Sequence, residues 1–308
     1  MDPLDELARQ VDALEKIDDG YQFQRKARIL QSLWRAEKNL PIHIEPDGTR
    51  RGACMEPRFA EQSLANFLTS QIGQVVRREV DEYGNTKVYG RPRIFNNLLS
   101  SQPLAFNLFV PLQFDLALAT NVFRRMTCGR CHRVTRIDFE YSPGRRDERY
   151  LGDRSAFDVF VAFESGKGLP CFMGIEVKYH ENLNNPPSGH RARYDEVARD
   201  MKCFRSAAAE RLKSKPLQQV WRDHLLAGSL RLADGFADGF FVLLSPKDNN
   251  ACTEAVAAYR ECLDCADTFE HWTLEQVAGT IRQFRDDPWI AAFQNRYLNF
   301  TKVDCRLT

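Results

Sequence analysis

The sequence predicts a mixed α/β fold whose core runs helix, three strands, helix, strand, with a central sheet of mixed strand direction flanked by helices. Three observations predict this arrangement. Two segments repeat apolar residues every three or four positions, as helices do, and four shorter segments have the alternating or continuous apolar pattern of strands. Gly, Pro, Ser and Asn gather between them. In chain order the segments are 101–126 (helix), 135–141, 155–164 and 171–179 (strands), 194–212 (helix) and 239–246 (strand).

An N-terminal helical extension precedes this core. Helical spacing also fits 4–17, 24–38 and 58–80, whereas the Pro- and Gly-containing stretch 41–57 lacks it. Because an amphipathic helix needs a partner for its apolar face, we expect these helices to pack on the core. The predicted organisation is a helical extension over 1–95, a core over 96–250, and C-terminal helices over 251–308 that complete the same domain.

Several local signals set the limits of the core elements. The first core helix begins near Ser101, and Pro111 predicts a kink inside it because proline removes a backbone donor. The strand 171–179 is followed by a loop over 180–189, which contains three Asn and two consecutive Pro residues. Residues 213–238 form an insertion before the last strand, with a further helix inside it.

Charged residues interrupt the two central strands. Asp158 lies on the first of them, and Glu176 and Lys178 lie on the second. Since side chains alternate across a strand, Glu176 and Lys178 must point to the same side of the sheet. Burying a carboxylate and an ammonium there costs several kcal/mol unless something compensates, and a hard divalent cation with oxygen ligands is a common compensation.

This pattern resembles the PD-(D/E)XK nuclease superfamily, whose signature is an Asp on one strand and Glu-X-Lys on the next. Here the matching residues are Asp158 and Glu176-Val177-Lys178, with Phe157 in the place of the proline. The resemblance implies that the two acids bind Mg²⁺ or Mn²⁺, with the Val177 carbonyl as a further ligand, and that Lys178 positions the attacking water. Phosphodiester hydrolysis has a use for each group, since a metal generates hydroxide and a cation stabilises the transition state.

Four further segments narrow the resemblance to a bacterial group of restriction endonuclease-like proteins, over most of the chain from about Ala27. The resemblance implies a restriction-endonuclease-like core and a DNA endonuclease, with a role in bacterial defence or DNA processing. The segments are 100–109, 153–158, 174–179 and 221–226.

A third acid on the first core helix, present in many members of the superfamily, has no clear counterpart here, because Asp115 is the only acidic residue in 101–126. Gln102 or Asn107 could supply a neutral oxygen to the metal instead. The alternative is that both side chains make local hydrogen bonds to the backbone of the helix start.

The nine cysteines suggest reduced thiols in a chain that has no export signal. Two pairs have metal-like spacing, Cys128 with Cys131 and Cys262 with Cys265. Together they could form a structural Zn²⁺ site. The alternative, which we favour, is that these cysteines are simply buried, as cysteine often is.

Basic residues gather directly after the metal-bearing strand and its loop. Where such a helix lies beside the cleavage site it can contact a phosphate backbone, although a solvated helix face has the same composition. The candidate nucleic-acid-binding residues are Arg191, Arg193, Arg199, Lys202 and Arg222.

Composition sets the wider frame. The net charge of +1 neither requires nor excludes nucleic acid, and no apolar run approaches the roughly 20 residues that span a bilayer. We therefore expect a cytoplasmic, metal-dependent endonuclease that acts on DNA in preference to RNA, with no membrane partner and with a homodimer left open. The alternatives are a catalytically silent protein that binds nucleic acid or another partner with a nuclease-like fold, and a zinc-stabilised interaction protein.

Overall fold

The computed structural model describes residues 2–15 and 21–307, and the chain forms two compact units. The first comprises Met1–Pro111 and Arg285–Thr308, and the second comprises Leu112–Phe284. The second unit contains both strands that carry the Asp and Glu-X-Lys residues, so the candidate site lies within it.

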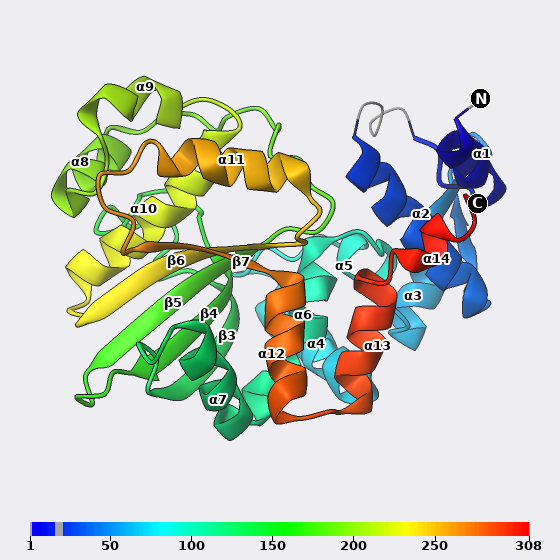
Figure 1. Cartoon of the computed structure of the whole chain (residues 1–308), viewed down its shortest axis with the longest axis horizontal. Helices are drawn as coiled ribbons and strands as arrows, with labels where there is room; N and C mark the ends of the chain where they lie inside the picture. Colours follow the sequence, from blue (N-terminus) through cyan, green and yellow to red (C-terminus); the bar gives the residue numbers. More distant parts are fainter. Residues whose placement is uncertain (1, 16–20, 308) are drawn as a thin grey trace. The chain divides into compact units, whose positions relative to one another are not determined.

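A five-stranded mixed sheet organises the second unit (Figure 1). Neighbouring strands are antiparallel from β3 through β5 and parallel from β5 through β7. The predicted α/β fold with a mixed sheet is therefore confirmed. In sheet order the strands are β3 (Arg133–Tyr141), β4 (Phe157–Glu164), β5 (Pro170–Val177), β6 (Asp238–Ser245) and β7 (Phe269–Thr273).

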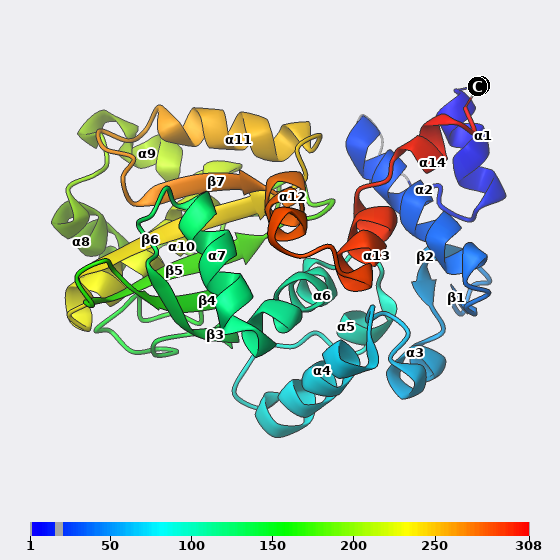
Figure 2. The same cartoon turned by 60° about the horizontal axis from the view of Figure 1, so that its bottom comes forward.

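Helices cover both faces of this sheet. One face is covered by α8 (Ala192–Met201), α10 (Leu217–Ala233) and α11 (Asn250–Arg260), and the other by α7 (Leu116–Met126) and α12 (Leu274–Phe284), as Figures 1 and 2 show. A short 3₁₀ turn (Ser206–Ala208) and α9 (Ala209–Leu212) connect α8 to α10.

Strand alternation explains which face receives which helix. Phe160 and Phe172 lie in one buried cluster with Trp221 and Leu225 of α10. Asp158 and Glu176 are two and four residues away along the same strands, so they lie on the face that α10 covers. The apolar part of that interface fixes the helix against the sheet beside the charged residues.

The first unit is mainly helical and has its own buried polar centre. Arg296 is fully buried, donates hydrogen bonds to Gln31 and Asn66, and lies 4.0 Å from the ring centroid of Trp34. Its elements are α1 (Pro3–Gln10), α2 (Gln22–Glu37), β1 (Ile42–Ile44), β2 (Arg50–Met55), α3 (Pro57–Ser63), α4 (Ser70–Tyr83), α5 (Arg93–Asn96), α6 (Ser101–Phe114), α13 (Pro288–Tyr297) and α14 (Thr301–Asp304).

Three predicted helices are interrupted. The segment 101–126 is divided at Asp115, because the Asp115 carboxylate accepts a hydrogen bond from Leu118 N–H (2.8 Å) and begins a new helix, α7; Pro111 lies inside the preceding helix, α6. The segment 194–212 ends its first helix where Lys202 adopts a left-handed conformation, and 58–80 does so at Leu64. The segment 4–17 is helical to Gln10, and its last two residues lie outside the described residues.

Three strands were not predicted. The stretch 41–57 contains the antiparallel pair β1 and β2, and β7 adds a parallel edge to the main sheet.

Within the described ranges, no single helix is both long and apolar enough to cross a membrane, although α6 and α7 meet those criteria when taken together.

Packing around Gly174 on β5 gives a test of this sheet. A Cβ atom at that position would lie 2.4 Å from the buried Phe157 ring. Gly174→Ala should therefore lower the free energy of unfolding by about 1–3 kcal/mol through overpacking, measured by urea denaturation. Gly166→Ala, in the turn between β4 and β5 where an added Cβ meets nothing within 4 Å, should change it by less than about 0.5 kcal/mol. Equal effects of the two substitutions would contradict the packing described for β5.

Candidate active site

The antiparallel register of β4 and β5 brings Asp158 and Glu176 together. Val159 pairs with Ile175, so the next position in the ladder sets Asp158 opposite Glu176. Asp158 also ties the two strands through its side chain, because its Oδ2 accepts a hydrogen bond from Val177 N–H at 2.8 Å. The first carboxylate is thus held by the backbone of the strand that carries the second.

Lys178 completes the group directly after β5. Its N–H donates to the Leu244 carbonyl (2.8 Å), which continues the parallel pairing with β6, and its Nζ donates to Glu176 Oε1 at 2.7 Å. The residue is only 6% exposed. Burial alone would lower the pKa of Lys178, but the carboxylates of Glu176, Glu181 and Asp158 outweigh burial and raise that pKa above its usual range. Lys178 is therefore an ammonium ion.

The pKa of Asp158 is also raised, but for a carboxyl group this favours the neutral form. Burial, followed by repulsion from Glu176, raises the pKa of Asp158 well above its ordinary value, against the attraction of Lys178. Glu140 on β3 adds to this repulsion, although its own carboxylate is bound by Arg145 at 2.8 Å. The metal-free site therefore favours the protonated form of Asp158, because Lys178 does not offset burial and the charge of Glu176 together.

Helix α10 supplies two residues that the sequence analysis did not select. Gln219 Nε2 donates to Glu176 Oε1 at 3.0 Å. Asp223, one helical turn later, is 3% exposed, and its Oδ2 has no hydrogen-bond partner among the described residues. Burial and then Glu176 raise the pKa of Asp223 to about 8. The signal in the sequence that could have identified these two residues is their i, i+4 spacing, which sets both side chains on one face of the helix.

These observations fit a divalent cation. Two acids face each other across β4 and β5, and a third, Asp223, is buried nearby with an unpartnered oxygen, so ionisation of all three would leave a repulsion that a cation could offset. No group of three or more His, Cys, Asp or Glu side chains in the described ranges is placed to bind a metal together. Asp158 and Glu176 are thus the two acids that the strand register sets opposite each other, and Asp223 is buried close enough to Glu176 for the two to repel when both are ionised.

The two amides predicted as further ligands lie in the first unit and make hydrogen bonds within it. Asn107 Oδ1 accepts from Leu68 N–H at 2.8 Å, and its Nδ2 donates to Asn66 and Tyr297. Gln102 Oε1 accepts from Gly90 N–H, and its Nε2 donates to the Val88 carbonyl. Both side chains are thus engaged by segments distant along the chain, and not by the backbone of the helix start as the alternative interpretation had it.

The four cysteines are not gathered into a zinc site in the part of the chain that the structure describes. Cys131 and Cys262 are buried, whereas their partners in sequence, Cys128 and Cys265, are exposed. Burial raises the pKa of the Cys131 thiol to about 12, which disfavours the thiolate that binds zinc. The simple burial that we favoured describes the two inner cysteines.

The predicted basic residues divide into two kinds. Arg191, Arg199 and Lys202 are exposed on or beside α8. Arg193 instead supports the fold, because it donates to the carbonyls of Arg149 and Tyr150. Arg222 lies on α10, next to Asp223, and its Nη1 donates to Ser188 Oγ at 2.6 Å.

The comparisons with known proteins identify one family. The sequence model of the PD-(D/E)XK nuclease superfamily matches residues 17–299 of the chain. No curated protein and no solved structure matches the chain.

The raised pKa of Asp223 predicts a pH effect on stability. Because the folded protein holds this proton more tightly than the unfolded chain, whose carboxyl titrates near 3.8, the free energy of unfolding should fall as the pH rises from about 4 to 8. Asp223→Asn should remove this loss, and should stabilise the metal-free protein by roughly 2–4 kcal/mol more at pH 8 than at pH 5. Urea denaturation with EDTA at the two pH values measures it. Asp264→Asn, an exposed carboxylate, is the control, and the same pH dependence in both variants would count against the assignment.

Proposed function

The chain belongs to the PD-(D/E)XK nuclease superfamily, and we propose that it is a divalent-metal-dependent endonuclease that hydrolyses phosphodiester bonds in DNA. The observation that carries the proposal is the convergence of Asp158, Glu176 and Lys178 at one end of β4 and β5, where Lys178 Nζ lies 2.7 Å from Glu176 Oε1. A role in bacterial defence or DNA processing, in the cytoplasm, belongs to the same proposal.

Asp158 and Glu176 would hold the metal, Mg²⁺ or Mn²⁺, with the Val177 carbonyl as a further ligand. Lys178 and Gln219 both donate to Glu176 Oε1, so Oε2, which receives no hydrogen bond from the described residues, is the oxygen left for the ion. In the same way Val177 N–H engages Asp158 Oδ2 and leaves Oδ1. When bound, the ion would lower the pKa of a coordinated water and neutralise charge on the scissile phosphate.

Lys178 would act as a cation and not as a base. The surrounding carboxylates raise its pKa, so the side chain has no lone pair with which to take a proton. Its remaining N–H groups can bind the attacking water or a phosphate oxygen, where charge develops in the transition state. Its hydrogen bond to Glu176 fixes that ammonium group beside the metal ligand.

The exposed residues Arg191, Arg199 and Lys202 would bind the phosphate backbone of the substrate. They lie on or beside α8, which follows the metal-bearing strand β5 and its loop along the chain. Each contact of this kind neutralises one phosphate and releases counterions.

A cleavage assay tests the proposed function. Plasmid, single-stranded DNA and RNA are incubated with the protein and Mg²⁺ or Mn²⁺, and EDTA should abolish the reaction. Asp158→Ala removes a metal ligand and Lys178→Ala removes the fixed cation, so each should lower the cleavage rate by about 10²-fold or more.

Glu164→Gln is the matched control, because this carboxylate lies at the opposite end of β4 and pairs with Arg133. Its cleavage rate should equal that of the unsubstituted protein. Circular dichroism must show that all variants are folded. If the Asp158 and Lys178 variants cut as fast as the control, the proposed site is wrong, and a folded protein that binds DNA without cutting it would favour the silent alternative.

The salt dependence of binding tests the α8 surface. Arg199→Gln with Lys202→Gln, in the Asp158→Ala background that prevents cutting, should weaken DNA binding and reduce the slope of log K against log salt by about 0.9 per lost phosphate contact. Fluorescence anisotropy over a salt range of ~50–200 mM measures the affinity and its salt dependence. Arg133→Gln, an exposed cation on β3, should leave the slope unchanged, and a similar loss there would show general charge attraction only.

A further inference from the structure

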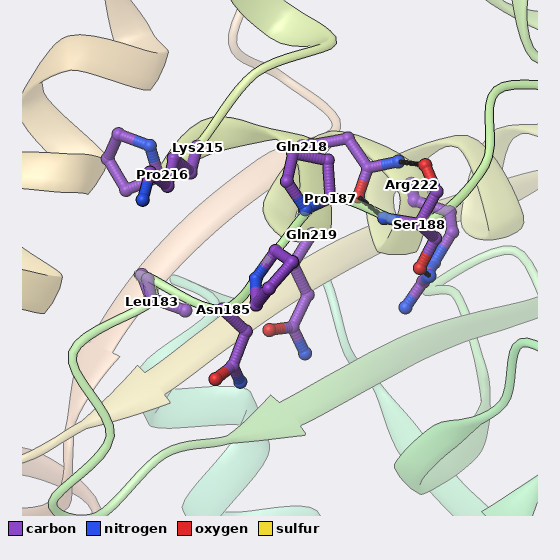
Figure 3. Close-up of a pocket in the computed structure, with 10 residues that line it drawn as sticks. Leu183, Asn185, Pro187, Ser188, Lys215, Pro216, Gln218, Gln219 and Arg222 are labelled. Atoms are coloured by element: carbon purple, nitrogen blue, oxygen red, sulfur yellow. Dashed lines mark hydrogen bonds between the residues drawn. The ribbon is translucent and has the colours of Figure 1, made fainter.

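A pocket of about 220 Å³ opens between the loop that follows β5 and the start of α10 (Figure 3). Its walls come from the loop residues 183 and 185–188 and from residues 215, 216, 218, 219 and 222. Pockets for small molecules usually measure about 300–1,000 Å³, so this one suits a small group that belongs to a larger ligand.

The charge of the pocket indicates the chemistry of that group. Lys215 and Arg222 are the charged side chains that line it, and no acidic side chain among the described residues does so. Amides and a hydroxyl supply most of the remaining polar atoms, from Asn185, Gln218, Gln219 and Ser188. A lining of this composition favours a small anion with several acceptor oxygens.

Arg222 has donors to spare. Its Nη1 donates to Ser188 Oγ, but its Nε is buried and has no hydrogen-bond partner within the described ranges. The nearest acid is Asp223, whose Oδ1 lies 3.9 Å from that Nε. A planar guanidinium with free N–H groups is suited to bind two oxygens of one phosphate.

The pocket is already shaped and adjoins the candidate active site. Gln218 accepts from Ser188 N–H (3.2 Å) and donates to the Ser188 carbonyl (3.0 Å), and Figure 3 shows these bonds holding the loop against the helix. Gln219 lines the pocket and also donates to Glu176 Oε1. One side chain therefore separates the pocket from a proposed metal ligand.

We propose that this pocket binds a phosphate group of the nucleic-acid strand that the candidate active site cuts. Arg222 and Lys215 supply the positive charge, and Gln219 connects the pocket to Glu176 of that site. The inference rests on the proposed endonuclease function and adds to it a defined phosphate subsite beside the scissile bond. The group is either an internal phosphodiester or the terminal phosphate of a strand, which share the same oxygen chemistry.

Binding measurements on the full chain test the subsite. Asp158→Ala protein is titrated into fluorescein-labelled single strands, with fluorescence anisotropy as the readout. The strands are about 20 nucleotides long, which exceeds the roughly 4–16 nucleotides that one single-strand-binding fold covers. Lys215→Gln and Arg222→Gln should each weaken binding by about fivefold or more and lower the salt slope by about 0.7 on a single strand. Arg222→Lys keeps the charge but not the planar donors, so its affinity should lie between those of Arg222→Gln and the protein with Arg222 intact.

Arg211→Gln is the matched control. It removes an exposed cation on the neighbouring helix α9, which pairs with Glu261 and does not line the pocket, so binding should change by less than about twofold. Lys215 is exposed, so its substitution tests the subsite even if the Arg222 variants fold poorly. Lys215 and Arg222 variants that bind as the Arg211 variant does would overturn the proposal.

Strands with and without a 5′-phosphate identify the source of the phosphate. A terminal phosphate predicts that the 5′-hydroxyl strand binds more weakly, by the same factor as Lys215→Gln, whereas an internal one predicts equal affinities. Cleavage by the unsubstituted protein separates the two proposals. If the unsubstituted protein cleaves and the Lys215 and Arg222 variants bind normally, the phosphate subsite alone is refuted. If these variants bind more weakly but the unsubstituted protein does not cleave, the nuclease function alone is refuted.

Discussion

Repulsion among carboxylates held against one face of the sheet is the constraint on which the second unit depends. Asp158 and Glu176 occupy facing positions at the end of the β4–β5 ladder, and burial penalises the charge of Asp158. Lys178 offsets part of the repulsion, and the backbone N–H of Val177 fixes Asp158 in place. Without metal, protonation of the acids whose pKa values are raised relieves the remaining repulsion, and the side chains stay in positions where a cation could replace those protons.

Helix α10 contributes to the core and to the candidate site at the same time. Trp221, Leu225 and Leu226 bury its apolar side against the sheet, and this packing sets Gln219 and Asp223 beside Glu176. The neighbouring His224 is part of the core, since both of its ring nitrogens bond to Tyr259 and Thr268, and burial lowers the pKa of His224 to about 3. One helix thus joins the core, the proposed metal site and the pocket.

The sequence was informative where a short-range rule applied. Alternation along β5 requires Glu176 and Lys178 to share a side, and their atoms lie 2.7 Å apart. The sequence Thr273 to Gln276 predicts a capping box at the start of α12, and the reciprocal bonds are present at 2.9 and 3.1 Å. The break at Asp115 was missed because a strong cap inside an apolar pattern competes with Pro111, and the pattern alone does not rank the two.

What the sequence could not supply was the contribution of elements distant along the chain. Gln219 is 43 residues from Glu176, and no periodicity relates a position on α10 to one on β5. Their contact depends on how the apolar side of the helix packs on Phe160 and Phe172, which is decided by side-chain volumes and not by spacing. The strand motif therefore identifies the atoms that would perform hydrolysis, whereas the residues that tune their charge and position the substrate follow from tertiary packing.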